Sequence, residues 1–292
     1  MPLSFSEINL EQQHAYRTRL ASCEQKASDY SFVNLWSWSG VHELSWAWEE
    51  DLVWVRQRSP REQLWAPVGR WEGVDWHSRL SGFEPGTTFA RVPLRLLQRW
   101  EAELGDRLSV EESRGQWDYL YTVDDLVRLS GNRLHKKKNL VRQFLRNYAY
   151  TYRPMSGGIV ERARELQEDW CTWRDCESHE ALTAENKAIE RVLASWDSIH
   201  GLLGGALIVE EKMVAYTVAE RLNAATMLIH FEKADPEYKG AYQAINQMFL
   251  EAEAEGVDRV NREQDLDDPG LRKAKTSYQP VDFLKKYAVT LL

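Results

Sequence analysis

The spacing of apolar residues changes several times along the second half of the chain. Alternation of apolar and polar residues predicts strands, and spacings of three and four predict helices. On this basis we predict strands at residues 148–154, 205–209, 214–220, 226–232 and 257–260. We predict helices at residues 159–176, 180–200 and 241–252 and a last helix that begins at Pro269. Asp267 and Asp268 favour this start, because an acidic N-cap followed by proline is typical of a helix N-terminus.

The first half is distinguished by its tryptophans, since ten of the thirteen lie at or before Trp117. Trp36 with Trp38, and Trp46 with Trp48, are two residues apart, a spacing that places both rings on one face of a strand. Such rings are either core residues or a wall that stacks sugars or bases. Further strands are predicted at residues 52–56, 63–67, 87–92 and 117–123, and a helix at 94–104.

These elements predict an α/β (α+β) protein. In the second half the order is helix, helix, three strands, helix, strand, helix, strand, which resembles the Gcn5-related N-acetyltransferase (GNAT) fold. We therefore expect two tandem GNAT-like domains with mixed central sheets flanked by helices. Residues 1–123 would form a degenerate copy, residues 124–148 a basic connecting helix, and residues 149–292 the domain with the active centre.

The composition is that of a globular protein, with 43% apolar residues, 28% charged residues and a formal net charge of -8. The acidic balance argues against a surface covered with basic residues, although a local basic patch is compatible with it. No apolar run approaches the roughly 20 residues that span a bilayer, and no secretory signal pattern is present. Because Cys23, Cys171 and Cys176 lack metal-binding spacing, we expect three reduced thiols in a cytoplasmic protein.

A basic amphipathic helix is predicted at residues 132–148. Lys138 and Arg142 lie on its polar face and would be solvated or would bind an anion. Arg133 and Lys137 fall among the apolar residues by helical phase, unless the helix begins after them. A cation held there needs an anionic partner, and a phosphate is the natural candidate.

A second candidate segment runs from His230 through Glu232 into the turn before the helix at 241–252. In acetyltransferases of this fold, that turn holds the coenzyme A diphosphate with backbone N–H groups. Gly240 fits this role, but Glu237 and Tyr242 replace residues that admit a diphosphate. Acyl-coenzyme A is therefore disfavoured as a cofactor. His230 and Glu232 are candidates for either a structural or a catalytic role.

A third segment, residues 261–280, places charged residues around the start of the last helix. Leu271, Ala274, Lys275 and Tyr278 recur at spacings of three and four, which places Lys275 on the inward stripe of that helix. The Lys275 ammonium would either reach solvent or stabilise an oxyanion. Arg262 and Arg272 are candidates to support it.

The chain resembles the stand-alone form of a family that shares a domain with the C-terminal part of bacterial phosphatidylglycerol lysyltransferases. The resemblance is carried by FVNLWSW, NRLHKKKNLVRQF, HFEKADPEYKGAYQAIN and NREQDLDDPGLRKAKTSYQP. Related Fem-type aminoacyl-tRNA transferases have a Leu-x-x-x-Lys-x-x-aromatic pattern that contributes a lysine to the active centre, which implies this role for Lys275 with Tyr278. The family's own Glu-Lys and Asn-Arg-Glu motifs imply substrate contacts from Lys233, Asn261 and Glu263.

Three functions are compatible with these patterns. The resemblance implies transfer of an aminoacyl group from charged tRNA to an amine or hydroxyl acceptor whose identity the sequence does not give. A coenzyme A-dependent N-acyltransferase is the alternative enzyme. A binding protein that retains the fold without catalysis is the third.

Overall fold

The computed structural model describes residues 3–292, which divide into two compact units. Of the described residues, unit 1 comprises 3–118, 264–268 and 283–292, and unit 2 comprises 119–263 and 269–282. The sequence predicted two domains that are each continuous in the chain, with the last strand in the second. In the structure the last strand of the chain belongs to unit 1. Among the described residues, no helix is both long enough and apolar enough to span a lipid bilayer.

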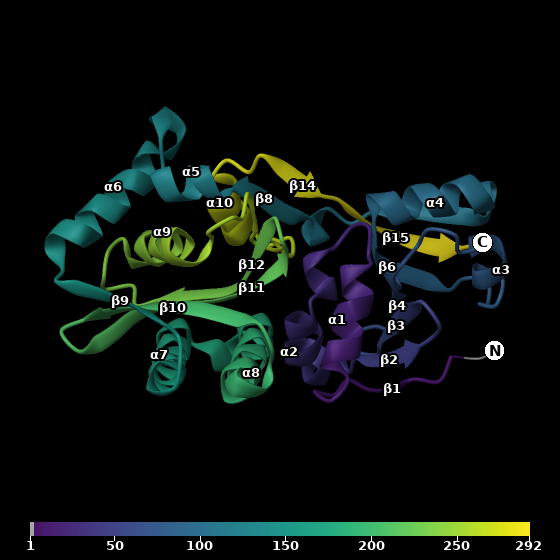
Figure 1. The fold of residues 1–292 in the computed structure, drawn as a ribbon, viewed down its shortest axis with the longest axis horizontal. Helices are drawn as coiled ribbons and strands as arrows, with labels where there is room; N and C mark the ends of the chain where they lie inside the picture. The colour runs from purple at the N-terminus through teal and green to yellow at the C-terminus, as the bar shows by residue number, and fades with distance from the viewer. Residues whose placement is uncertain (1–2) are drawn as a thin grey trace. The chain divides into compact units, whose positions relative to one another are not determined.

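Unit 1 contains a mixed sheet in the order β1-β2-β3-β4-β6-β15-β7, with β5 paired to β3 (Figure 1). Its helices are α1 (Gln13–Ala21), α2 (Phe32–His42), α3 (Trp76–Leu80) and α4 (Leu94–Leu104). Its strands are β1 (Ser6–Glu7), β2 (Ser45–Trp48), β3 (Leu52–Gln57), β4 (Gln63–Trp65), β5 (Val68–Gly69), β6 (Thr88–Pro93), β7 (Leu108–Glu112) and β15 (Lys286–Leu291). The order of two helices, several strands, a helix and a strand repeats the GNAT-like order that was predicted for the second half.

The tryptophans of unit 1 are mainly core residues. Trp46, Trp54 and Trp100 are fully buried, so the rings stabilise the unit by removing apolar surface from water. The prediction of a strand at Trp36 and Trp38 was wrong, because both lie in α2. A serine N-cap, Ser31, accepts a hydrogen bond from the third residue of this helix, which favours a helix over a strand.

Unit 2 contains a second mixed sheet, in the order β14-β8-β13-β12-β11-β10-β9. Its strands are β8 (Asp118–Thr122), β9 (Tyr150–Pro154), β10 (Leu202–Val209), β11 (Lys212–Asn223), β12 (Thr226–Ala234), β13 (Arg259–Asn261) and β14 (Asp282–Leu284). Asp118 of β8 and residues 283–284 of β14 are assigned to unit 1. Its helices are α5 (Val123–Arg128), α6 (Gly131–Asn147), α7 (Gly158–Arg174), α8 (Glu180–Ala194), α9 (Ala241–Glu253) and α10 (Pro269–Thr276). The GNAT-like element order predicted for the second half is therefore confirmed.

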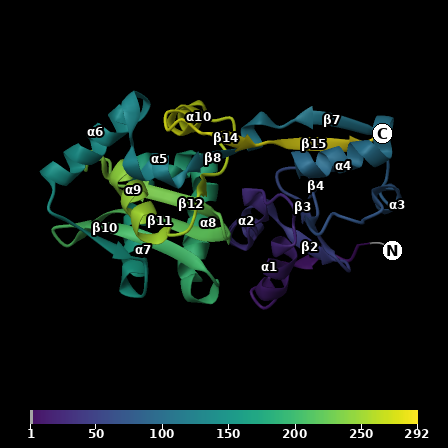
Figure 2. The same ribbon diagram turned by 45° about the horizontal axis from the view of Figure 1, so that its top comes forward.

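Helices cover both faces of the unit 2 sheet. Figure 1 shows α7 and α8 on one face and α9 on the other, and Figure 2 shows α6 beside α9 from a second direction. The single helix predicted at residues 124–148 is two helices, because Leu129 and Gly131 have positive φ angles between them.

The expectation of three reduced thiols was wrong. Cys171 and Cys176 form a disulfide with a Cα–Cα distance of 5.0 Å, and Cys23 is free and buried. Helix α7 ends at Arg174 and Asp175 is left-handed, so the chain turns back and brings Cys176 against the last turn of the helix. A continuous helix over residues 159–176 would not have allowed this turn.

Candidate active site

The candidate site forms where the two parallel strands of unit 2 separate. Strands β12 and β13 pair in parallel from Thr226 with Arg259 to Leu228 with Asn261, and the pairing ends there. The register of β12 against β11 also shifts around His230, which marks a β-bulge. Ligands of α/β proteins bind outside the carboxyl ends of parallel strands, and bulges frequently re-aim side chains beside such sites.

Five side chains meet around the separated strand ends and are called the strand-end cluster: Lys137, Glu232, Arg262, Lys275 and Tyr278. They come from α6, β12, the residue after β13, α10 and the turn after α10. The chain thus brings together three segments that the sequence had marked separately.

Arg262 is fixed by Glu232. Nη2 of the guanidinium lies 2.5 Å from Oε2 of the carboxylate, and Asn246 Nδ2 donates to Oε1 at 2.9 Å. Burial works to lower the pKa of Arg262, but Glu232 outweighs it and raises that pKa. Because both oxygens of Glu232 accept hydrogen bonds, Glu232 positions a permanent cation and is poorly placed to act as a base.

The Tyr278 ring contacts two cations. The centre of the Arg262 guanidinium lies 4.7 Å from the ring centroid, and Lys137 Nζ lies 4.3 Å from it. Tyr278 is buried, and Lys137 is half-buried. Burial lowers the pKa of Lys137, and the nearby Arg262 lowers it further. The site therefore holds positive charge against an aromatic wall.

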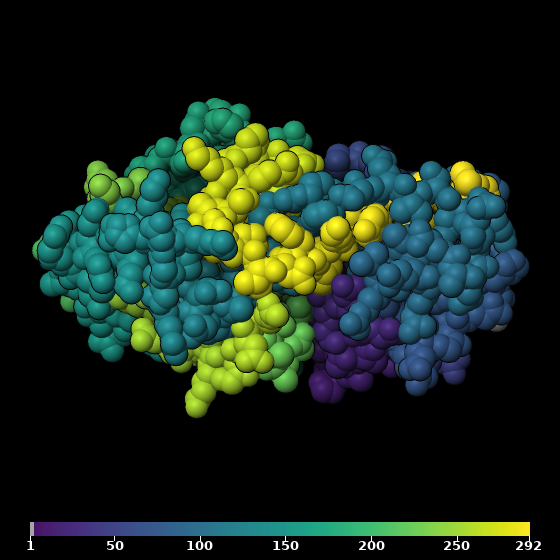
Figure 3. Space-filling model, turned by 90° about the horizontal axis from the view of Figure 1, so that it is seen from above, coloured from purple at the N-terminus to yellow at the C-terminus, as the bar shows by residue number. Residues whose placement is uncertain are grey.

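Lys275 joins the cluster through the backbone of Arg262. Its ammonium donates to the Arg262 carbonyl oxygen at 2.5 Å, and the Tyr121 hydroxyl donates to the Lys275 carbonyl oxygen at 2.8 Å. The predicted inward stripe holds for Lys275 and Tyr278 but not for Leu271, which is 45% exposed, or for Ala274, which is also exposed. Helix α10 lies at the surface, where Figure 3 shows the C-terminal segment in yellow.

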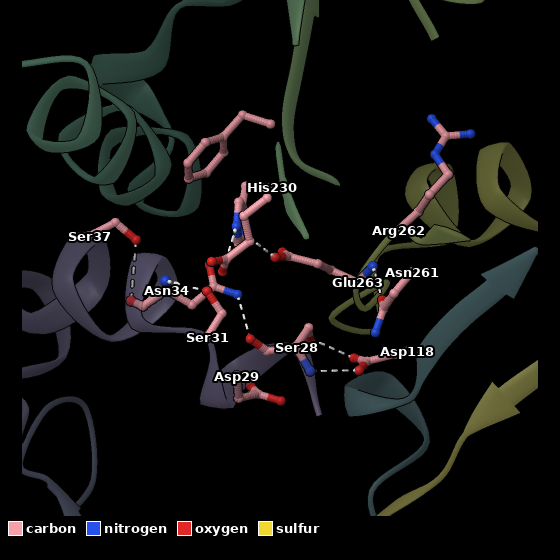
Figure 4. Close-up of polar contacts among 12 residues, drawn as sticks. Ser28, Asp29, Ser31, Asn34, Ser37, Asp118, His230, Asn261, Arg262 and Glu263 are labelled. Atoms are coloured by element: carbon pink, nitrogen blue, oxygen red, sulfur yellow. Dashed lines mark hydrogen bonds and ion pairs between the residues drawn. The ribbon is translucent and has the colours of Figure 1, made fainter. Parts of the chain in front are cut away.

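His230 lies in a separate buried group with two carboxylates. Its Nδ1 is 3.0 Å from Glu263 Oε1 (Figure 4). Its Nε2 is 3.3 Å from Glu220 Oε1. Burial works to lower the pKa of His230, but the two carboxylates outweigh it and raise the pKa to about 9. The imidazole is therefore charged at neutral pH and does not accept a proton there. Asn261 orients Glu263, because its Oδ1 accepts from the Glu263 N–H at 2.8 Å.

Lys233 and Tyr242 belong to another group of side chains, which Trp170 joins. The Lys233 ammonium lies 2.7 Å from Glu185 and 3.7 Å from the Trp170 ring centroid. The Trp170 Nε1–H donates to the Tyr242 hydroxyl at 2.9 Å. Burial lowers the pKa of Lys233, and Glu185 works against this effect.

Gly240 is required for packing of α6. It has φ of 93°, and an added Cβ would lie 2.2 Å from the Leu140 carbonyl oxygen of α6. The turn also uses its own donors, since the Glu237 and Tyr238 N–H groups bind Asp235 and the Ala241 N–H binds Tyr238. These groups are not available to a diphosphate while the turn keeps this conformation.

The remaining basic residues lie outside the cluster. Arg133 and Arg142 are exposed, and Lys138 Nζ is 3.5 Å from the Arg128 carbonyl oxygen. Arg133 lies in the first turn of α6, one helical turn before Lys137, and points to solvent despite its helical phase. Arg272 lines a shallow surface pocket with α10 residues such as Lys273 and Thr276.

Sequence reasoning missed the partners that hold these residues, namely Glu220, Asn246, Glu185, Trp170 and Tyr121. One signal was available. Asn246 is a polar residue within the apolar stripe of α9, and it is buried at 1% exposure. A buried amide needs hydrogen-bond partners, so its position marked a polar contact in the core.

Comparisons with known proteins agree with this architecture. The family described as "Phosphatidylglycerol lysyltransferase, C-terminal" matches residues 20–290. A conserved protein of unknown function from Bacteroides thetaiotaomicron is 29% identical, with all of both chains covered and a TM-score of 0.89. L-PGS from Bacillus licheniformis is 14% identical, with 98% of this chain and 93% of that chain covered and a TM-score of 0.65.

One curated relative is an uncharacterized protein from Mycoplasmoides gallisepticum. It is 26% identical over 176 residues, which are 60% of this chain and 56% of the relative. The matched region thus spans little more than half of that protein.

Proposed function

Because this chain belongs to the phosphatidylglycerol lysyltransferase C-terminal family, we propose that it transfers an aminoacyl group from a charged tRNA to an amine or hydroxyl acceptor. In this reaction the acceptor nitrogen or oxygen bonds to the ester carbonyl carbon. The ester bond to the tRNA ribose then breaks, and the proton of the acceptor ends on the ribose hydroxyl. A charged-tRNA donor implies a cytoplasmic reaction.

The observation that carries this proposal is the concentration of fixed positive charge at the separated strand ends. Attack on an ester carbonyl builds negative charge on its oxygen, and preorganised cations stabilise that charge without giving up a proton. Lys275 is the proposed oxyanion-stabilising residue, since its ammonium is held at the Arg262 carbonyl oxygen. Arg262 adds a second charge, which Glu232 keeps in place.

The turn at Gly240 favours tRNA over acyl-coenzyme A as the donor. The backbone of α6 closes on Gly240, and several N–H groups of the turn already have partners within it. A diphosphate that used the N–H groups of Glu237, Tyr238 or Ala241 would have to break these hydrogen bonds. An aminoacyl-tRNA makes no such demand on the turn.

The test is loss of labelled amino acid from charged tRNA in the presence of a panel of amine and hydroxyl acceptors. Lys275→Met keeps the aliphatic stem but removes the cation, so activity should fall by roughly 10²–10³-fold with little change in stability. Lys273→Met removes an exposed lysine of the same helix and serves as the matched control. Equal activity in the two variants would show that Lys275 is not part of the centre. Transfer from acetyl-coenzyme A, together with a thermal shift on its addition, would favour the alternative donor.

A further inference from the structure

Lys137 differs from the two buried lysines of the described residues, Lys233 and Lys286, in lacking an acidic partner. Lys233 is paired with Glu185, and Lys286 of unit 1 is paired with Asp29 and Asp118. Lys137 has no carboxylate within ion-pairing distance among residues 3–292, and its ammonium rests on the Tyr278 ring.

The surroundings of Lys137 do not favour a positive charge. Burial and the neighbouring Arg262 both lower its pKa, and the carboxylate of the cluster, Glu232, is bonded to Arg262 and Asn246. In addition, Arg262 Nη1 is buried without a hydrogen-bond partner among the described residues. Lys137 and Arg262 therefore have N–H groups beside the Tyr278 ring that can donate hydrogen bonds to a bound anion.

The basic face of α6 indicates which anion this is. Lys138, Arg142 and Arg146 recur every four residues, so they follow one side of the helix at spacings of about 6 Å. Arg142 and Arg146 are exposed. A row of cations, half-buried at Lys138 and exposed at Arg142 and Arg146, suits a polyanion with regularly spaced phosphates.

We infer that Lys137 binds a backbone phosphate in the single-stranded end of an RNA, with the α6 row contacting further phosphates. This inference rests on the proposed function for the identity of the RNA as the aminoacyl donor. It assigns Lys137 to substrate binding and leaves Lys275 to the chemical step. No covalent step involves Lys137.

The experiment measures binding of a short fluorescent single-stranded RNA to the full chain as a function of salt. Lys137→Met should weaken binding at least about tenfold, which is the effect of losing one charged hydrogen bond. It should also reduce the slope of log affinity against log salt by about 0.7, the amount for one single-strand phosphate contact. Lys137→Arg should restore much of the RNA affinity and much of the salt dependence.

Lys136→Met is the matched control, because it removes an exposed neighbouring charge on the same helix. If Lys137→Met and Lys136→Met have the same affinity and slope, Lys137 is a solvated lysine packed on a ring and the inference is wrong. Vesicles with anionic lipid are the second probe. Binding to vesicles that depends on Lys137, with RNA binding unchanged, would replace RNA by a lipid phosphate.

The outcome separates this inference from the proposed function. Lys275→Met should bind RNA as the unchanged protein does while losing transfer. If RNA binding depends on Lys137 but no acceptor supports transfer, the binding site stands and the proposed reaction fails. If Lys137→Met transfers the aminoacyl group as well as the unchanged protein does at low RNA concentration, the inferred role of Lys137 is wrong and the proposed reaction stands.

Discussion

The buried histidine of unit 2 predicts a specific dependence of stability on pH. His230 has a pKa of about 9 in the folded protein, against an ordinary value of 6.5 that applies to the unfolded chain. A group whose pKa is raised by folding stabilises the protein fully below its unfolded pKa. That contribution is lost as the pH rises through the folded pKa. Stability from His230 should therefore decline between about pH 6.5 and pH 9.

The magnitude follows from the size of the shift. Each pKa unit corresponds to about 1.4 kcal/mol, so the difference between 6.5 and about 9 gives roughly 3 kcal/mol. Solvent screening reduces this value little, because the His230 side chain has no exposed surface. The source is the pair of carboxylates, Glu220 and Glu263, which lie on either side of the ring.

The measurement is the free energy of unfolding by urea at several pH values from 6 to 9.5, for the unchanged protein and for His230→Gln. Subtracting the two curves cancels the other titrating groups. The difference should fall by about 3 kcal/mol across this range. His135→Gln, which changes an exposed histidine of α6, should give a flat difference. A flat difference for His230→Gln as well would refute the charged-histidine interpretation.

Three further predictions concern stability and one concerns the donor. Gly240→Ala should cost about 2 kcal/mol or more in thermal unfolding, because its Cβ would meet the α6 backbone at positive φ. Glu232→Ala should cost roughly 3 kcal/mol in urea unfolding, since it leaves Arg262 without its carboxylate; Glu232→Gln should cost less. Reduction of the disulfide between Cys171 and Cys176 should cost about 2 kcal/mol, as expected for a loop with a separation of 5 residues, and a Cys171→Ser variant should not respond to the reductant. Acetyl-coenzyme A should leave the melting temperature unchanged, whereas a ligand at 100 times its Kd would add about 2.7 kcal/mol.

Local spacing predicted the elements of unit 2 well but could mislead in unit 1. The pairs Trp36 with Trp38 and Trp46 with Trp48 have the same spacing, yet the first pair lies in α2 and the second in β2. A spacing of two fits a strand, but a helix that is largely buried also carries apolar residues on nearly every side. The serine cap before α2 was the better signal there.

The sequence marked several cations of the candidate site, but it did not show which residues pair with them. Helical phase placed Lys137 and Lys275 near the core, and the structure brings Lys137 to the Tyr278 ring and Lys275 to the Arg262 carbonyl oxygen. The same reasoning failed for Arg133, because phase alone does not say where along its length a helix meets its neighbour. The pairing of Glu232 with Arg262 joins residues 30 positions apart, so it depends on the sheet register and not on local pattern.

Gly240 was predicted as a possible diphosphate contact, and the structure gives it a packing role. A glycine at the start of a helix resembles a diphosphate cradle, and the positive φ at Gly240 agrees with that pattern. The atom that needs the space is the Leu140 carbonyl oxygen of α6. Only the tertiary structure shows that the approach is between two backbones.

The position of β15 has a consequence for the order in which the protein can fold during synthesis. This strand lies between β6 and β7 in the sheet of unit 1, and its Lys286 binds the buried Asp29 and Asp118 of that unit. Both neighbouring strands and both carboxylates leave the ribosome well before β15, since all of unit 2 is translated in between. Domains commonly fold as they emerge. Here the unit that is made first must wait with an open sheet and without the Lys286 ammonium, although Arg91 already pairs with Asp29. The unit that is made second can be finished before it.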